Sequence, residues 1–318
     1  GLSESEKEEK LEKFIRIEDA ILAEDNEVLK SEFSVSGSEE FTSAIYPDGS
    51  NLIWFAAQHG KFNVIETLIA CGCTPTLLGE CGRTILDVVI EENSAKLILK
   101  SILESDGEKG INEVGSVLYD AVINQKKEIV ELILKYAPDS AKIIAPNGQT
   151  PLYRAVMMSN EKEIVELILK YAPDSAKITD KDGKTILSIE IAQKEKEMVE
   201  LILKYAPDSA KITDYQYGYT ALHWAICSQD KEMINLLLQT DKSLADIENN
   251  EGESPLKFAK YLEEIEHWNI RDIIEILESY EEQESSVAPV DVHVADSSVV
   301  ENPLAGDALH HNDLESQI

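Results

Sequence analysis

Cysteine and histidine side chains in one stretch of this 318-residue chain form its best candidate for a metal site. Cys71 and Cys73 are separated by one residue, Cys81 follows them, and His59 precedes them. Structural zinc sites pair cysteines about two to four residues apart and add a second pair of ligands. Cys71 and Cys73 instead fall at the end of an expected helix and in its connector, where cysteine acts as a small apolar filler. We therefore expect structural cysteines here and no metal.

Motifs of catalysis are missing from the sequence. It contains no glycine-rich phosphate loop, no nucleophile elbow and no helical zinc-protease motif. The 61 Asp and Glu residues are so frequent that no catalytic carboxylate pair stands out. Most of them, such as Glu161, Glu163 and Glu166, lie on the polar faces of expected helices, where we expect them to act as solubilising charge. The sequence predicts no catalytic residue, no cofactor and a non-enzymatic protein.

The charge of the chain limits its partners. Only 29 Lys and Arg oppose the 61 acidic residues, which gives a formal net charge of −32. Such a surface repels phosphate groups, which argues against nucleic acid and anionic membranes. A basic patch on another protein is its natural complement. The same acidity would also keep an elongated protein soluble, and both interpretations stay open.

Other features of the composition favour a soluble protein of the cytoplasm. No apolar run approaches the roughly 18 residues that span a bilayer, and the first residues, GLSESEKEEK, do not resemble a signal peptide. Four cysteines are too few for a disulfide framework and fit a reducing compartment. We expect no membrane insertion.

The elements that would position any site are set by an internal repeat. The segment Glu128–Ile143 recurs letter for letter at Glu163–Ile178, and again at Glu197–Ile212 with Met198 in place of an isoleucine. A second pattern follows a glycine in each copy: GQTPLYRA, GKTILSIE, GYTALHWA and GESPLKFA. Together with three divergent earlier copies, these boxes begin 32 to 35 residues apart, at Asn51, Thr84, Ser116, Thr150, Thr185, Thr220 and Ser254.

This pattern resembles the ankyrin repeat, which has a period of about 33 residues and a Thr-Pro-Leu-His-x-Ala box. The resemblance covers residues 51–280 and implies an all-α solenoid of about seven repeats, with two helices in each. The first residue of each box would cap the first helix of its repeat. His223 alone keeps the box histidine, which in the family bonds the loop between repeats, so its implied role is structural.

Some positions need a special backbone or depart from the family pattern. Gly148, Gly183, Gly218 and Gly252 precede the boxes and suit turns with positive φ. Ala-Pro-Asp replaces the usual Gly-Ala after three second helices, and the proline should end each of them. Glu190 stands where the family has a small alanine, so we expect the first helix of the fifth repeat to be rotated or locally loose.

Three segments follow from these patterns. Residues 1–46 should form an N-terminal helical cap and a loop, since 11–33 has helical periodicity. Residues 47–280 should form the array, whose last repeat carries an insertion near 263–269. Residues 281–318 contain nine Asp and Glu and no Lys or Arg, and we expect a disordered acidic tail. Its end, Glu315–Ile318, has the form that PDZ domains capture, which is a minor alternative.

The resemblance also implies where a partner would bind. Ankyrin arrays bind proteins through their loop tips and through the concave face of the first helices. The candidate residues at the loop tips are Asn147, Gln149, Lys181, Asp182, Tyr215, Gln216, Tyr217 and Tyr219. The candidates on the inner face are Glu91, Glu92, Met157 and Met158. For the two methionines, packing between repeats is an equally good interpretation.

The loop from Asp214 to Tyr219 is the sharpest candidate. The corresponding loop one repeat earlier, Asp180–Lys184, is charged, whereas this one carries three tyrosines between near-identical flanks. In an extended segment, Tyr215, Tyr217 and Tyr219 would share one face, unless Gly218 breaks that alignment. They would offer a partner rigid contact area. The alternative is that they pack on one another.

The functional expectation is a scaffold that binds another protein. One version is an effector that an intracellular bacterium secretes into the host cytosol, suggested by the style of the duplicated repeats. A second is an acidic inhibitor that masks a basic surface of a transcription factor or another regulatory protein. A third is the targeting module of a larger enzyme.

Overall fold

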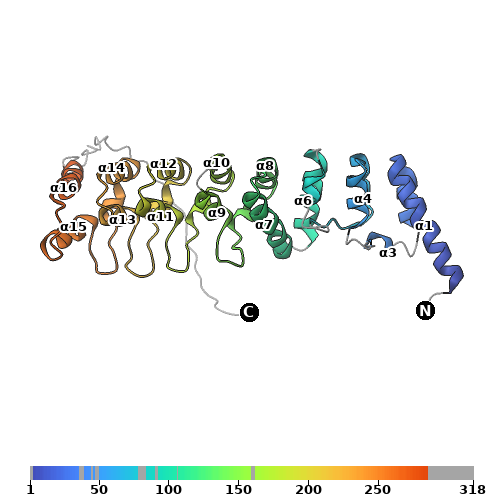
Figure 1. Ribbon diagram of the computed structural model, residues 1–318, viewed down its shortest axis with the longest axis horizontal. Helices are drawn as coiled ribbons and strands as arrows, with labels where there is room; N and C mark the ends of the chain where they lie inside the picture. Colours follow the sequence, from blue (N-terminus) through green and yellow to red (C-terminus); the bar gives the residue numbers. More distant parts are fainter. Residues whose placement is uncertain are drawn as a thin grey trace, which may run out of the picture.

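The computed structural model describes residues 3–35, 39–43, 46, 50–77, 84–89, 92–105, 107–158 and 162–285. Over these residues the chain is built of helices, with no strands. The helices stack side by side into one elongated array, with the N-terminal helices at one end and α15 and α16 at the other (Figure 1). The expected all-α solenoid is therefore confirmed.

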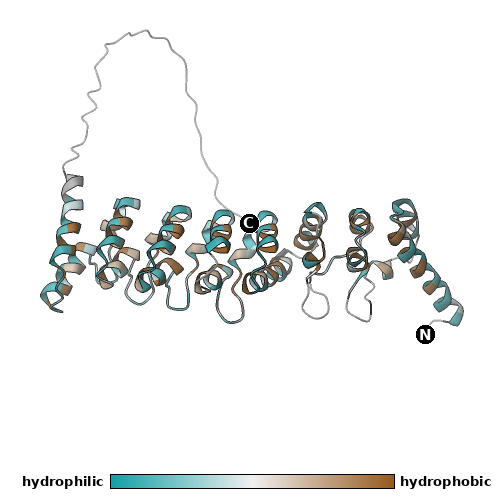
Figure 2. Cartoon of the chain, turned by 45° about the horizontal axis from the view of Figure 1, so that its top comes forward, coloured by the Kyte–Doolittle hydropathy of each residue, from teal (hydrophilic) through white to brown (hydrophobic). Residues whose placement is uncertain are grey.

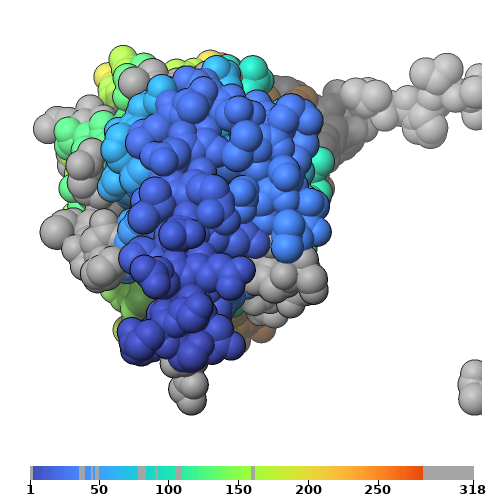
Figure 3. Space-filling model, turned by 90° about the vertical axis from the view of Figure 1, so that its right-hand side faces the viewer, coloured from blue at the N-terminus to red at the C-terminus, as the bar shows by residue number. Residues whose placement is uncertain are grey.

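A helix pair closes the N-terminal end. Helix α1 spans Glu4–Ala23 behind a capping box made by Ser3, and α2 spans Asn26–Ser34 behind the side chain of Asp25. Ile17, Ile21 and Leu29 are fully buried against the array. These helices cover the end of the molecule, as repeat arrays require (Figure 3). Their exposed side chains are mostly charged, although Leu11 and Ile15 are exposed as well. The short helix α3, Glu39–Thr42, lies within the expected loop and buries Phe41.

The first two repeats differ from each other in their first helices. In the first repeat, Asn51 caps α4, Leu52–Gln58, as expected, and the second helix consists of η1, Phe62–Val64, and α5, Ile65–Ala70. In the second repeat, Thr84 caps only one 3₁₀ turn, η3, Ile85–Asp87. The chain then enters α6, Glu92–Ser105. The expectation of a full first helix in this repeat was wrong.

The third repeat shows the clearest departure from the expected phase. Ser116 does not cap a helix, because it lies in the middle of the 17-residue helix α7, Gly107–Ile123. Gly115 therefore does not form a turn. A Cβ atom on Gly115 would lie 2.4 Å from Cγ1 of Ile143, so this glycine lets α7 pass close to the following segment. The repeat is completed by α8, Lys127–Tyr136, and η4, Pro138–Lys142.

The remaining four repeats are regular. The hydroxyls of Thr150, Thr185 and Ser254 accept backbone hydrogen bonds at the starts of their helices, and Thr220 forms a capping box with His223. The elements in chain order are α9 (Pro151–Met157), α10 (Lys162–Tyr171), η5 (Pro173–Lys177), α11 (Ile186–Gln193), α12 (Lys196–Tyr205), η6 (Pro207–Lys211), α13 (Ala221–Cys227), α14 (Lys231–Thr240), η7 (Lys242–Asp246), α15 (Pro255–Glu264) and α16 (Arg271–Ser285).

The core lies between the two helix layers and between neighbouring repeats. In α10, Ile164, Val165, Ile168 and Leu169 are at most 1% exposed. One repeat alone could not bury so broad an apolar face, whereas stacking between α8 and α12 does. In Figure 2 the helices are hydrophilic along one side and hydrophobic along the other. The expected interior is confirmed.

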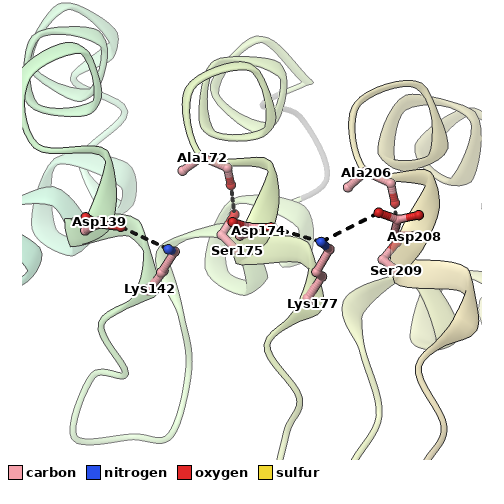
Figure 4. Close-up of polar contacts among 9 residues, drawn as sticks. All are labelled: Asp139, Lys142, Ala172, Asp174, Ser175, Lys177, Ala206, Asp208 and Ser209. Atoms are coloured by element: carbon pink, nitrogen blue, oxygen red, sulfur yellow. Dashed lines mark hydrogen bonds and ion pairs between the residues drawn. The ribbon is translucent and has the colours of Figure 1, made fainter. Parts of the chain in front are cut away.

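The Ala-Pro-Asp segments form identical short turns. Each proline starts a 3₁₀ helix, and the serine two residues later donates a hydrogen bond to the alanine carbonyl, as Ser175 does to Ala172 at 2.7 Å. Lys177 bridges Asp174 of its own turn and Asp208 of the next one (Figure 4). The three turns thus repeat one local geometry, and this bridge joins the last two of them.

The outer helices are also tied to one another by charges. Lys127 pairs with Glu163 and Lys162 with Glu197, in each case across to the next repeat. Glu166 accepts hydrogen bonds from Lys204 and from Tyr205. Glu163 and Glu166 are therefore more than the free solubilising charge that the sequence suggested, although exposed pairs of this kind stabilise a fold little. Glu161 lies outside the described residues.

At the C-terminal end, α16 continues to Ser285. Residues 281–285, which the sequence assigned to the tail, are thus helical. The rest of the expected disordered tail, with its candidate PDZ ligand, lies outside the described residues. Within the part of the chain that the structure describes, no helix is both long enough and apolar enough to cross a membrane.

Candidate partner-binding surface

Four hairpin loops project from the regular part of the array on the same side (Figure 1). We call them fingers 1 to 4: residues 145–149, 180–184, 214–219 and 249–253. Each is closed by a backbone hydrogen bond between its first and last residues, at 2.9 to 3.1 Å. Near the end of each finger, a glycine with φ between 71° and 82° makes the turn, which confirms the expectation for Gly148, Gly183, Gly218 and Gly252.

Backbone hydrogen bonds join the later fingers into a row. The N–H of Tyr215 in finger 3 donates to the carbonyl of Asp182 in finger 2 at 3.1 Å. The N–H of Asn250 in finger 4 donates to the carbonyl of Tyr217 at 2.9 Å. A Cβ on Gly183 would lie 2.5 Å from the nitrogen of Tyr215, so only glycine allows this approach. Fingers 2 to 4 therefore present one connected backbone surface.

The tyrosines of finger 3 do not share one face. Tyr215 is 69% exposed and Tyr217 is 45% exposed. Tyr219 turns inward, where its ring stacks on His223 and packs at a tilt against Phe258, with ring centroids 5.5 and 4.9 Å away. Burial raises the pKa of Tyr219 to about 12. Tyr217 stacks on Tyr219, with ring centroids 5.0 Å apart, so the alternative that the tyrosines pack on one another holds for this pair. Tyr215 and the outer face of Tyr217 stay exposed, and Tyr219 is part of the core beneath them.

Two residues that the sequence analysis missed support finger 3 from below. Asp214 is 4% exposed, and its carboxylate accepts hydrogen bonds from the N–H of Tyr217 at 2.7 Å and from Nε1 of Trp224 at 3.1 Å. The ammonium group of Lys184 lies 4.3 Å from the centroid of the Trp224 ring. The role of Asp214 could have been predicted from the sequence. Asp180, Asp214 and Asn249 each stand at the first position of a finger, where Asp and Asn side chains cap tight turns.

The other candidate tip residues lie on fingers 1 to 3. Asn147 donates a hydrogen bond to the hydroxyl of Tyr119 on α7 at 2.7 Å, and Gln149 accepts one from the same hydroxyl at 3.1 Å. Finger 1 is thereby fixed to α7. The polar residues at the exposed tips of fingers 2 and 3 are Lys181, Asp182 and Gln216.

His223 lies at the base of the fingers and is fully buried. Its Nδ1 is 2.9 Å from the hydroxyl of Thr220, and its Nε2 is 3.4 Å from the carbonyl of Glu253 in finger 4. Burial lowers the pKa of His223 to about 4, so the imidazole is neutral at physiological pH. The structural role that the resemblance implied is confirmed by these contacts.

Comparison with known families agrees with this architecture. The family model described as ankyrin repeats (3 copies) matches residues 96–178, 118–214 and 160–251, in overlapping windows. The chain belongs to the ankyrin-repeat family. No curated protein sequence matches it. Ankyrin repeats form a protein–protein interaction module.

The inner-face candidates of this ankyrin array occupy different places. Met157 is half-buried at the end of α9 and packs against the core, and Met158 follows it at the helix end. Glu92 begins α6 in the outer layer, where its carboxylate binds Lys135 and the Tyr136 hydroxyl. The inner-face expectation for Glu92 was wrong, because η3 is one turn long and the chain reaches the outer layer early. Glu91 lies outside the described residues.

The described cysteines of the array are Cys71, Cys73 and Cys227. Cys73 is 4% exposed, and burial raises the pKa of its thiol to about 12. Nδ1 of His59 lies 2.8 Å from the carbonyl of Phe55 in its own helix. Cys81 lies outside the described residues. Among the residues that the structure describes, no three His, Cys, Asp or Glu side chains are grouped as metal ligands would be.

Proposed function

We propose that this ankyrin array is a non-enzymatic scaffold that binds a partner protein through its finger row, with Tyr215 and Tyr217 as the anchors. The observation that supports this most is their exposure, 69% and 45%, on a finger whose backbone is bonded to both neighbours. Aromatic rings of this size are usually buried, and exposed ones on a rigid loop offer contact area at low entropic cost.

Polar side chains surround the two anchors. Lys181 and Asp182 lie on finger 2, and Gln216 lies between the tyrosines and donates a hydrogen bond to the Tyr217 hydroxyl at 2.7 Å. On finger 1, Asn147 and Gln149 extend this surface. An aromatic centre within a polar rim is the usual anatomy of a specific protein interface. Their place on the fingers supports assigning these residues to one surface.

Charge favours a basic partner. The chain carries a net charge of −32, and −23 of it belongs to residues 1–280. An acidic surface of this size accelerates association with a basic patch, and the effect weakens as salt screens it. The masking of a basic regulatory surface is the narrower role that this charge supports. The roles of effector in a host cytosol and of targeting module have no support in the contacts described above. Capture of the C-terminus by a PDZ domain likewise has none.

Affinity capture from a cell extract with the full chain as bait, followed by binding measurements on the captured protein, tests this proposal. Tyr215→Ala and Tyr217→Ala should each weaken binding by about 1–3 kcal/mol. Tyr261→Ala is the matched control, because Tyr261 is 42% exposed but lies on α15 and outside the fingers. Equal losses for all three variants, or none for the finger variants, would contradict the assignment.

A repeat of the measurement at two salt concentrations separates the two interpretations of the acidity. Binding to a basic patch should weaken between low and physiological ionic strength. An affinity that does not change with salt would mean that the acidic residues serve solubility and do not contribute to binding.

A further inference from the structure

Glu190 occupies a position that alanine fills in most other repeats. The equivalent residues, counted from the first residue of each box, are alanines that are at most 3% exposed: Ala56, Ala121, Ala155, Ala225 and Ala259. The Glu190 side chain is itself 3% exposed. Helix α11 nevertheless spans Ile186–Gln193 with its cap in place, so the expected rotation or loosening is wrong. The array holds a carboxyl group where its packing otherwise accepts a methyl group.

Among the residues that the structure describes, no cationic side chain pairs with Glu190. Within the described residues, its Oε1 atom is buried and has no hydrogen-bond partner. Lys162 lies nearby but pairs with Glu197. Burial, reinforced by the charge of Glu195, raises the pKa of Glu190 to about 7. Burying a carboxyl group without a partner destabilises a fold. The unpaired Oε1 atom of Glu190 can therefore accept a hydrogen bond from a group outside the chain.

Glu190 lines a cleft of about 160 Å³ between α9 and α11. Val156, Met157 and Met198 provide apolar walls, and Glu195 and Glu197 provide acidic groups beside them. The fingers precede the first helices, whereas these residues are at the ends of the first helices and the starts of the second ones. The cleft therefore lies on the opposite edge of the array from the fingers.

We propose that this cleft is a second binding site, which receives one lysine side chain from a bound protein. The four-carbon stem of lysine matches the two methionine side chains and the valine, and its ammonium group would supply hydrogen bonds and charge to the Glu190 carboxylate. The acidity of the chain as a whole favours the approach of such a group. The site does not depend on the finger row.

Other ligands fit the cleft less well. Its volume is below the roughly 300–1,000 Å³ of pockets for drug-sized molecules. Its carboxylates repel anions. The described residues do not group three His, Cys, Asp or Glu side chains as a metal ion requires. One cationic side chain satisfies both the apolar walls and the carboxyl group.

The test uses methionine methyl groups, because the chain has only four methionines. Met157 and Met198 line the cleft, whereas Met158 and Met233 do not and serve as internal controls. The full chain, labelled with methyl-¹³C methionine, is titrated with n-butylammonium at pH 8, with n-butanol as the uncharged probe. We expect saturable shifts of the Met157 and Met198 signals with n-butylammonium only.

Variants assign the effect to Glu190. Glu190→Gln should weaken the binding of n-butylammonium about tenfold or more, because the buried charge is lost. Glu195→Gln removes an exposed charge at the rim of the same cleft and should weaken the binding of n-butylammonium less than about threefold. An unchanged Met233 signal shows that each variant is folded. Equal shifts with n-butanol, equal affinity in Glu190→Gln, equal losses in both variants or no shift at Met157 and Met198 would each overturn the proposal. Tyr215→Ala should not alter the titration, which separates this site from the finger row.

Discussion

The backbone N–H of Tyr215 donates a hydrogen bond to the carbonyl oxygen of Asp182, 3.1 Å away, and so joins the candidate anchor finger to its neighbour. Fixing the backbone before a partner arrives lowers the entropic cost of binding. The exposed rings of Tyr215 and Tyr217 are thus presented on a preorganised surface rather than on a free loop.

This junction should be sensitive to substitution at Gly183. Gly183→Ala should lower the free energy of unfolding by about 2–4 kcal/mol, because it adds a clash with Tyr215 to the strain of a positive φ. Gly148→Ala is the control: its φ is 80°, close to the 82° of Gly183, but no atom lies within 4 Å of the added Cβ. It should lower that free energy by only about 1 kcal/mol. Urea unfolding measures the free energy of unfolding of both variants. Equal losses in the two variants would show that the contact between Gly183 and Tyr215 adds nothing to stability.

The buried and the exposed tyrosine of finger 3 should differ in how much their truncation lowers stability. Tyr219→Ala should lower the free energy of unfolding by about 3 kcal/mol, since its ring packs against His223 and Phe258. Tyr215→Ala should change it by less than about 0.5 kcal/mol. Thermal unfolding monitored by circular dichroism measures both. A large loss in Tyr215→Ala would make that ring structural and would weaken the proposed function.

His223 should make the array less stable in mild acid. Its pKa falls from 6.5 to about 4 on folding, so the unfolded chain binds the proton more tightly. The contribution of neutral His223 to the free energy of unfolding is fully present above pH 6.5. About 3 kcal/mol of it is lost as the pH falls toward 4. Nitrogen-15 NMR of the imidazole gives the pKa directly. An imidazole that titrates near 6.5 in the folded protein would contradict this expectation.

Glu190 should have the opposite dependence on pH. Its pKa rises from 4.5 to about 7 on folding, so the folded chain binds the proton more tightly. The contribution of Glu190 to the free energy of unfolding is most favourable below pH 4.5. It declines by about 3 kcal/mol as the pH rises to 7. The decline should be visible as a difference between the wild type and Glu190→Gln, which shares every other titrating group, including Glu195, Glu197 and Lys162.

Substitution of Glu190 by the residue of the other repeats supplies an independent check. Glu190→Ala should raise the free energy of unfolding at pH 8 by about 1–3 kcal/mol, because a buried, unpaired carboxylate is removed. Ala225→Gly, at the same position two residues before the end of α13, is a control for helix propensity and should lower it by about 1 kcal/mol. A lower stability of Glu190→Ala would mean that this carboxyl group has a stabilising partner.

The local features were predictable from the sequence wherever one residue type dictates one backbone conformation. Positive φ at Gly183, a helix end before Pro173 and a cap at Thr185 follow from side chains within a few residues of each position. The period of 32 to 35 residues then gave the order of the helices in the four regular repeats, which begin at Thr150, Thr185, Thr220 and Ser254. Ser116 broke the rule, because its box contains no residue that ends a helix.

The candidate site was less predictable, because its residues are selected by distance across repeats. Alternation along an extended strand placed Tyr219 beside Tyr215, but the ring contacts of His223 and Phe258 turn it inward. Glu92 was assigned to the inner face by counting, whereas the shortened first helix of its repeat moved it to the outer layer. Trp224 received no role, although it holds the base of finger 3.

By itself, then, the sequence determined an all-α array, the phase of its regular repeats and the position of its fingers, since these depend on periodicity and on local backbone preferences. The tertiary structure decided which side chains are presented and which are buried. Exposure depends on the neighbouring repeat about 35 residues away, and a pattern within one repeat contains no information about that packing. The same stacking surrounds Glu190 with apolar groups and acidic neighbours, and it leaves Tyr215 and Tyr217 at the surface.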